Sequence, residues 1–372
     1  MSQHLVAQGK AALRVTGHAD ATVIGADGTH YTDLTSGWCV ANLGWNNPAL
    51  MAQLPEFDGP DYVSPNHGYE HWDEYAALLA HVAPRGLTRS FRATGGSEAV
   101  DLALQAARLH TGRKRFLSLA GSYHGNTLAT LAAADGPIKP PLDERALARI
   151  EQRLEKETYA AFIFEPIAIN LGVIVPEPAF VRGLMRACRD TGTLLIADEV
   201  ACGFGRTGTL FASEQLKLKP DLMCLAKSAT NGMAPLGAML CTPAIARTME
   251  REGSFYSTYG WHPRSVHAAL ATLRYLISHG KSLYENAEAV SGYCCERLHR
   301  AAWRGDATIR VRGPAIAIDV HDADYASTIR KRCEKQRLLV ADEGTAVVLL
   351  PPLTAGRPLI AEALDVLERC ID

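Results

Sequence analysis

The sequence predicts an α/β protein whose larger part is a mostly parallel sheet flanked by helices. Two uninterrupted apolar runs, residues 193–197 and 222–226, are typical of strands covered on both faces of such a sheet. Strand and helix patterns alternate over residues 88–245, which favours parallel crossover connections. Strand patterns also occur at both chain ends, which we expect to form a smaller α/β domain together. We place its two parts at residues 1–55 and 261–372, and the large domain at residues 56–260.

The composition is that of an ordinary globular protein. The chain has 372 residues, 47% of them hydrophobic, and a net charge of −2, which indicates neither a nucleic-acid nor an anionic-membrane partner. No apolar run approaches the ~20 residues that span a bilayer, and the first residues lack the apolar core of a signal peptide. The nine cysteines are scattered without metal-type spacing, so we expect no metal, free thiols and a cytoplasmic location.

The first third of the chain predicts a hairpin, an irregular loop and two helices. Residues 12–34 carry an Asp-Gly turn between short alternating runs, which is a hairpin signal. In the loop that follows, Trp38 and Trp45 are either core anchors or walls of a pocket. A helix is expected over residues 70–81 and another over 98–110. Gly96 and Ser97 precede the second helix, and they either cradle an anion with their amides or form an ordinary Gly turn with a Ser cap.

Several chemically useful side chains are expected where strands meet one edge of the sheet. Tyr123 and His124 follow one strand pattern, as a stacking ring and an imidazole, or simply as packed core residues. Glu165 ends the next strand, and a helix over residues 180–191 leads to a strand closed by Asp198. Lys227 closes the strand after that. Ligands bind outside the carboxyl ends of such strands, so the acid and the amine are expected at one mouth, unless both are unrelated surface charges.

The remainder of the chain predicts a turn and then the second part of the smaller domain. A Gly/Pro-rich turn and another strand follow Lys227, and a helix is expected over residues 263–279. Residues 281–372 then show a helix, strand patterns in ATIRVRG, PAIAIDV, LLVA and AVVLL, and further helices.

Taken together, the motifs TGGSEAV, SYHG, FEP, ADEV, GFGRTG, AKS and TYG, in this order, resemble those of the class III aminotransferases. These are fold-type-I enzymes that use pyridoxal 5′-phosphate. The resemblance covers nearly the whole chain. It implies a large domain with a mostly parallel sheet of the seven-stranded type, flanked by helices, and a smaller α/β domain built from both chain ends. In TGGSEAV, Gly95 stands where the family usually has Ser.

The resemblance also implies a role for each residue that matches a motif. Lys227 would bind the cofactor as a Schiff base and then move the proton, and Asp198 would keep the pyridine nitrogen protonated. The remaining roles would be cofactor contacts: Val200 and Tyr123 on the two ring faces, His124 beside them, Gly96 and Ser97 at the phosphate, and Thr258 reaching the phosphate of a neighbouring subunit. The last contact implies a homodimer with shared active sites.

Three departures from the family pattern concern the substrate. Ala201 replaces a common Gln, and Asn170 stands where members that use 2-oxoglutarate have a Glu that gates a substrate-binding Arg. That Arg would align with Val348, so a fixed clamp for an α-carboxylate is not expected. Trp38 is similar to the tryptophan of amine:pyruvate-type transaminases that lines the pocket, and we assign Trp38 and Glu165 to the substrate side.

The predicted function is that of an aminotransferase. It would move an amino group between a terminal amine or amino acid and an oxo acid. The first alternative is an aminomutase of the glutamate-1-semialdehyde type, which EPIAINLG also resembles, although GFGRTG favours a transaminase. The second alternative is a binding module that has kept the fold, which the intact Lys227, Asp198 and phosphate loop disfavour.

Overall fold

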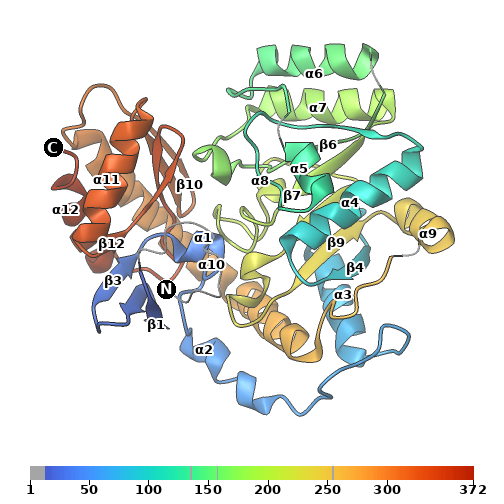
Figure 1. Ribbon diagram of the computed structural model, residues 1–372, viewed down its shortest axis with the longest axis horizontal. Helices are drawn as coiled ribbons and strands as arrows, with labels where there is room; N and C mark the ends of the chain where they lie inside the picture. Colours follow the sequence, from blue (N-terminus) through green and yellow to red (C-terminus); the bar gives the residue numbers. More distant parts are fainter. Residues whose placement is uncertain (1–12, 135, 157, 254) are drawn as a thin grey trace, which may run out of the picture.

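The computed structural model describes residues 13–134, 136–156, 158–253 and 255–372. It has two lobes (Figure 1): a large lobe around the central sheet and a smaller lobe, at the left of the view, that contains the C-terminus and the first strands. In these ranges, no helix combines the length and the apolar content needed to cross a bilayer.

The central sheet has six strands in the described chain, in the order β4-β9-β8-β7-β6-β5. β9 runs antiparallel to both neighbours, and the other adjacent pairs are parallel. Every residue of β6, β8 and β9 is buried, as expected for a sheet covered on both faces. The strands are β4 (Arg89–Ala93), β5 (Arg115–Leu117), β6 (Tyr159–Phe164), β7 (Leu194–Asp198), β8 (Leu222–Leu225) and β9 (Gly237–Cys241).

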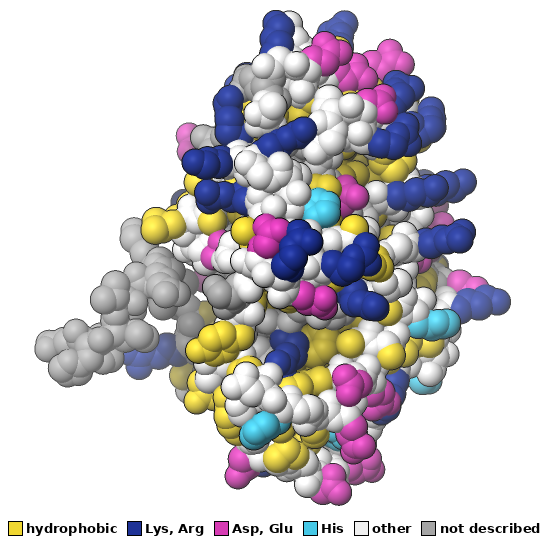
Figure 2. All heavy atoms as spheres, turned by 90° about the vertical axis from the view of Figure 1, so that its right-hand side faces the viewer, with side chains coloured by type: hydrophobic (Ala, Val, Ile, Leu, Met, Phe, Trp, Pro, Cys, Tyr) yellow, Lys and Arg dark blue, Asp and Glu magenta, His cyan; other side chains and the backbone are white. Residues whose placement is uncertain are grey.

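Helices cover both faces of this sheet, which confirms the predicted α/β class. Phe162 and Phe164 of β6 pack in one hydrophobic cluster with α3 (Glu70–Val82), α6 (Glu144–Lys156) and α7 (Pro178–Thr191). Ala161 and Ile163, which alternate with them, pack in another cluster with α4 (Gly96–Thr111), α5 (Leu128–Ala134) and α9 (Pro243–Glu252). The side of the large lobe that carries α9 shows Lys and Arg mainly in its upper half, with hydrophobic side chains gathered below (Figure 2).

The seventh position of the expected sheet is reduced, in the described chain, to a single parallel bridge between Leu119 and Ile138. Pro137, Pro140 and Pro141 surround Ile138. A proline has no backbone N–H to donate to a neighbouring strand, so a longer ladder cannot form here.

The smaller lobe contains two sheets. In the first, β1 (Val15–Ala19), β2 (Thr22–Gly25) and β3 (His30–Asp33) are antiparallel, and β12 (Leu338–Leu339) pairs with β3 in parallel. The pairing of β3 with β12 confirms that both chain ends build this lobe. The second sheet has the order β10-β11-β14-β13, and α11 (Ala323–Lys335) and α12 (Arg357–Glu368) share a hydrophobic cluster with it. Its strands are β10 (Thr308–Arg312), β11 (Ala315–Asp319), β13 (Ala341–Glu343) and β14 (Ala346–Leu349).

A single long helix, α10 (Pro263–Arg300), joins the two lobes. The sequence predicts a helix that ends at residue 279 and a new helix after it. The structure instead continues through Gly280 as one helix, because its two halves pack in the cores of the two lobes. Val266 and Leu273 pack in the large-lobe core, whereas Val290 and Leu298 pack in the smaller lobe. The domain boundary near residue 260 therefore stays a prediction. The short elements are α1 (Ser36–Cys39), α2 (Pro48–Met51), α8 (Ala212–Gln215), and the 3-10 turns η1 (Leu54–Glu56), η2 (Ile169–Leu171) and η3 (Lys227–Thr230).

Candidate active site

A cavity of about 390 Å³ lies at the carboxyl ends of β6, β7 and β8. Parallel strands of an α/β sheet commonly bind ligands at this edge. Eight of the ten residues that the sequence assigns to the site line the cavity: Gly96, Ser97, Tyr123, His124, Glu165, Asp198, Val200 and Lys227. These eight residues come from five separate segments of the chain, which the cavity brings together.

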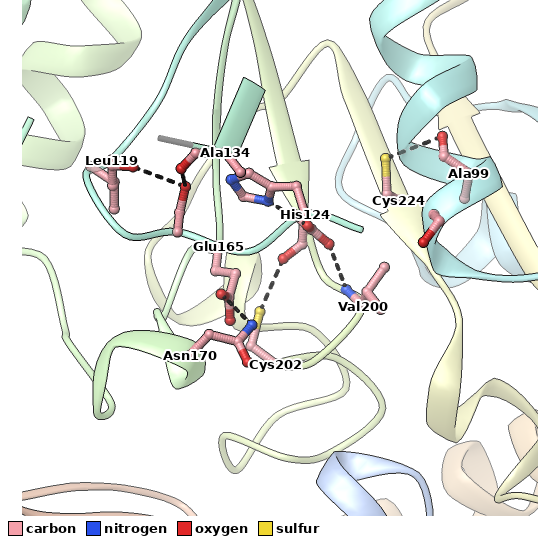
Figure 3. Close-up of polar contacts among 12 residues, drawn as sticks. Ala99, Leu119, His124, Ala134, Glu165, Asn170, Val200, Cys202 and Cys224 are labelled. Atoms are coloured by element: carbon pink, nitrogen blue, oxygen red, sulfur yellow. Dashed lines mark hydrogen bonds and ion pairs between the residues drawn. The ribbon is translucent and has the colours of Figure 1, made fainter. Parts of the chain in front are cut away.

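Asp198, the last residue of β7, has both carboxylate oxygens bound. His124 Nδ1 lies 2.7 Å from Oδ2, and the backbone N–H of Val200 donates to Oδ1 over 3.1 Å (Figure 3). Both side chains are almost fully buried. His124 Nε2 is also buried and has no hydrogen-bond partner among the residues that the structure describes. These contacts fix the orientation of the carboxylate, and they leave a polar ring atom free for a hydrogen bond to a ligand or a water molecule.

Lys227 follows β8 and begins the 3-10 turn η3. Its backbone has φ 46°, in the left-handed region that a lysine rarely adopts. Such a conformation is retained only where the surrounding structure holds it, and it is common at functional sites. Lys227 and Asp198 line the same cavity, which confirms that β7 and β8 bring the amine and the acid to one mouth.

The start of α4 supplies free backbone donors to the cavity wall. Its N-cap is Gly95, which makes no side-chain cap bond, while Ser97 lies inside the first turn and its hydroxyl accepts from the N–H of Asn126. The alternative of an ordinary Ser cap is therefore wrong. A Cβ at Gly96 would lie 2.9 Å from Val200 Cγ1. The backbone at Gly96 therefore lies closer to the Val200 side chain than a residue with a side chain would allow. Amides at a helix start, together with the helix dipole, suit a phosphate.

Tyr123 and Val200 line the cavity from two different segments. Tyr123 is 47% exposed and lies in the turn after β5, and Val200 follows Asp198 in the turn after β7. An aromatic ring and a branched aliphatic side chain can both pack against a flat ring.

Glu165 follows β6 and is buried beside Asp198. Its Oε1 accepts from Asn170 Nδ2 at 2.7 Å (Figure 3), and its Oε2 accepts from the N–H of Ile169 at 3.0 Å. Burial, and secondly the negative charge of Asp198, raise the pKa of Glu165 to about 7. This carboxyl can therefore gain or lose a proton near neutral pH.

The two remaining sequence-assigned residues lie outside this cavity. Thr258 lines a neighbouring cavity of about 490 Å³ together with Gly96 and Ser97, so it reaches the same helix start from another side. Trp38 does not line the active-site cavity. It packs, half-buried, against a cluster that includes Cys39 and Ala201. Val40, from the same loop, lines the cavity instead.

Sequence reasoning missed several residues that shape the site. The sequence predicts only that the Gly/Pro-rich turn after Lys227 connects two strands. In the structure, four residues of this turn line the cavity: Gly232, Ala234, Pro235 and Leu236. Arg206, within GFGRTG, is fully buried and donates to Asn42 Oδ1 and to the carbonyls of Pro351 and Pro314. The glycine content of the turn and the charge of Arg206 were visible in the sequence, but their tertiary partners were not.

The fold and the cavity together define an α/β enzyme with a site for a flat anionic cofactor. The donor set fits pyridoxal 5′-phosphate: amides for a phosphate, a fixed carboxylate for a ring nitrogen, an amine for a carbonyl, and an unpartnered His124 Nε2.

Comparisons with known proteins agree with this assignment. The sequence model of the family described as Aminotransferase class-III matches residues 5–144 and 139–371, and the chain belongs to this family. It is 31% identical to a putrescine aminotransferase of Pectobacterium atrosepticum, over 94% of this chain and 81% of that protein. It is 32% identical to an acetylornithine aminotransferase of Methanopyrus kandleri, over 91% of this chain and 89% of that protein.

Solved transaminase structures share the fold. A transaminase from Virgibacillus superimposes with a TM-score of 0.89 at 23% identity, over 97% of this chain and 93% of that one. The ω-transaminase of Pseudomonas jessenii, in complex with PMP, superimposes with a TM-score of 0.87 at 24% identity, over 96% and 93%. The protein is therefore a fold-type-I aminotransferase that depends on pyridoxal 5′-phosphate and acts on an amine or amino acid and an oxo acid. The aminomutase alternative is not favoured.

Proposed function

We propose that Lys227 binds the cofactor covalently and then carries the proton during transamination. When bound, pyridoxal phosphate supplies the electron sink that stabilises the substrate carbon from which a proton is removed. The Lys227 amine stands at the end of a wholly buried strand and lines the cavity. Its turn fixes the direction from which the amine enters the cavity, so one group can first hold the cofactor and later exchange a proton. The observation that carries this proposal is that Lys227 lines the same cavity as the Asp198 carboxylate, whose two oxygens are held by His124 and by the N–H of Val200.

Asp198 would hold the proton on the cofactor's ring nitrogen. A buried carboxylate next to a cationic nitrogen strongly favours the charged form of that nitrogen. His124 and the N–H of Val200 occupy one oxygen each, so the carboxylate cannot turn away from the cavity. The amides of Gly96 and Ser97 would bind the phosphate, and Tyr123 and Val200 would enclose the ring.

We also propose that the enzyme works as a homodimer in which Thr258 approaches the phosphate site of the partner. Thr258 lines the second cavity at Gly96 and Ser97, beside strongly exposed aromatic residues. Tyr256 is 73% exposed and Tyr259 is 62% exposed. Exposed apolar side chains of this size indicate an interaction surface. Sedimentation measurements on the holoenzyme test this: a dimer that Tyr259→Glu dissociates supports the proposal, and a monomer of full activity contradicts it.

For the amino donor, the site favours a terminal amine over a substrate that presents an α-carboxylate. Val348 stands at the position where other family members are expected to have a carboxylate-binding arginine, and its side chain is fully buried. Arg206 is bound to backbone and amide acceptors, and Arg310 is paired with Asp319 at 3.1 Å. Thus neither of these guanidinium groups is free to clamp a carboxylate. The relative named for putrescine fits this reading better than the relatives named for acetylornithine.

All nine cysteines are free thiols. This supports our proposal that the enzyme acts in the cytoplasm, where thiols remain reduced. Fractionation of cells that produce the protein tests this location.

The central test uses reduction of the holoenzyme with borohydride, followed by peptide mass spectrometry. We expect the cofactor mass on the peptide that contains Lys227, and no such adduct in Lys227→Ala. Incubation with single amines should then yield a carbonyl product without any oxo acid in the wild type and none in the variant. Full turnover by Lys227→Ala, or an adduct on another lysine, would refute the assignment.

A further inference from the structure

Glu343 lies on the face of the smaller lobe that packs toward the active-site cavity. It is the last residue of β13, which pairs Ala341 with Val348 and Glu343 with Ala346 across β14. Residues directly opposite in an antiparallel pair share a face. Ala341, Ala346 and Val348 belong to the hydrophobic cluster that contains Ala201. Glu343 therefore lies on the same face of the sheet as this cluster.

The same face reaches the cavity through the turn η2. Ala346 Cβ lies 3.1 Å from the position that a Cβ at Gly172 would occupy, and Gly172 closes the turn that carries Asn170. Asn170 and Ala201 both line the cavity. The positive charge of Lys227 also acts to lower the pKa of the Glu343 carboxyl. Glu343 is not one of the residues that line the cavity, but it lies on the face of the smaller lobe that contacts the turn carrying Asn170.

Neighbouring acids in this lobe form ion pairs, whereas Glu343 forms none with any residue that the structure describes. Asp342 faces the other way and binds Arg330 at 3.0 Å. Asp319 binds Arg310, which also donates to the carbonyl of Gly172. Among the described residues, no hydrogen bond or ion pair engages the side chain of Glu343. Burial, and secondly Asp342, raise the pKa of Glu343 to about 7, as expected for a half-buried carboxyl without a partner.

We propose that Glu343 is a specificity-determining residue that binds the distal ammonium of a diamine-type amino donor. The inference rests on the proposed function, in which the other amine of the donor reacts at the cofactor held by Lys227. A cationic group on the donor would supply the partner that Glu343 lacks. It would also be compatible with a site in which the guanidinium groups of Arg206 and Arg310 are already bound to protein acceptors.

Binding measurements test the inference without turnover. The cofactor-loaded Lys227→Ala protein is titrated by calorimetry with butane-1,4-diamine and with butan-1-amine. We expect the diamine to bind on the order of 10-fold more tightly, the size of one charge-assisted hydrogen bond at a half-exposed site. Adding Glu343→Gln should abolish this ratio, and adding Asp342→Asn should retain it. Thermal unfolding of each variant checks that it is folded, and Glu343→Asp provides a second, charge-retaining variant.

The same amines are then compared in single-turnover reactions of the holoenzyme with Lys227 intact. An unchanged ratio of diamine to monoamine in Glu343→Gln, in binding or in reaction, would overturn the inference. If the wild type converts both amines with equal efficiency, the inference fails while the aminotransferase assignment stands. If it converts no amine to a carbonyl product, the proposed role of Lys227 fails as well.

Discussion

His124 Nδ1 lies 2.7 Å from Asp198 Oδ2, and this contact is buried between the sheet and the cavity. It joins the turn after β5 to the end of β7, and so fixes the acid that faces the proposed ring-nitrogen position. The other nitrogen of His124 has no partner in the described structure. The orientation of Asp198 therefore depends on a residue from a different part of the chain.

The first prediction concerns this pair. Asp198→Asn should lower kcat roughly 10²-fold or more, because an amide cannot stabilise the charged ring nitrogen, while the covalent bond to Lys227 still forms. His124→Asn should lower kcat less, since the carboxylate remains and loses only one of its two fixed donors. Steady-state kinetics and borohydride labelling measure the two effects separately. Unchanged turnover in Asp198→Asn would place the ring-nitrogen contact elsewhere.

A second prediction tests the close approach at the start of α4. Gly96→Ala places a methyl group 2.9 Å from Val200 Cγ1, so the wall must move and the amides lose their alignment. We expect about a 10-fold weaker affinity for pyridoxal phosphate, measured by titration of the apoprotein. Gly95→Ala is the matched control, because its methyl group would contact nothing within 4 Å.

The double variant Gly96→Ala with Val200→Ala identifies the cause of this effect. Removal of the valine methyl groups should recover part of the affinity relative to Gly96→Ala alone. If Gly96→Ala binds the cofactor as tightly as the wild type, the wall at this helix start does not position the phosphate.

The sequence could predict at which edge of the sheet the site lies, because short stretches of sequence indicate where each strand ends. Asp198, Lys227 and Glu165 each end or follow a strand pattern, and parallel strands place their carboxyl ends together. Trp38 was harder to assign, because its direction depends on a loop in which Gly37, Trp38 and Cys39 all have positive φ. No periodic pattern indicates such a loop. Likewise, the merging of two predicted helices into α10 depends on packing against both lobes, which sequence periodicity alone does not reveal.

A third prediction follows from the raised pKa of Glu165, about 7 in the folded protein against an ordinary value of 4.5. Because the folded protein binds this proton more tightly than the unfolded chain, the contribution of Glu165 to stability is complete below about pH 4.5. It is lost as the pH rises towards 7. Glu165→Gln removes this dependence. The free energy of unfolding of the variant relative to wild type should therefore rise by up to about 3 kcal/mol between pH 4.5 and pH 8.

Denaturant unfolding of both proteins at several pH values measures this difference. Asn170→Ala provides a further check, because Asn170 Nδ2 donates to the Glu165 carboxylate and stabilises its charged form. Loss of this hydrogen bond should raise the pKa of Glu165. The pH range over which the free energy of unfolding changes should then move to higher pH. A difference between wild type and Glu165→Gln that does not change with pH would show that folding does not raise the pKa of Glu165.

The last prediction concerns Arg206, whose buried guanidinium links the two lobes. It donates to Asn42 Oδ1 through Nε and Nη2, and to the carbonyl of Pro351 through Nη1 at 2.7 Å. Arg206→Met removes the charge but leaves these acceptors buried and unpaired, so we expect a loss of roughly 3 kcal/mol in the free energy of unfolding. The exposed Arg182 has no ion pair or hydrogen bond in the described structure, and Arg182→Met should change stability by less than about 0.5 kcal/mol. Thermal and denaturant unfolding measure both. Equal stability of the two variants would mean that the carbonyl and amide groups around Arg206 find other partners, and that the lobes are held together by α10 and its hydrophobic contacts alone.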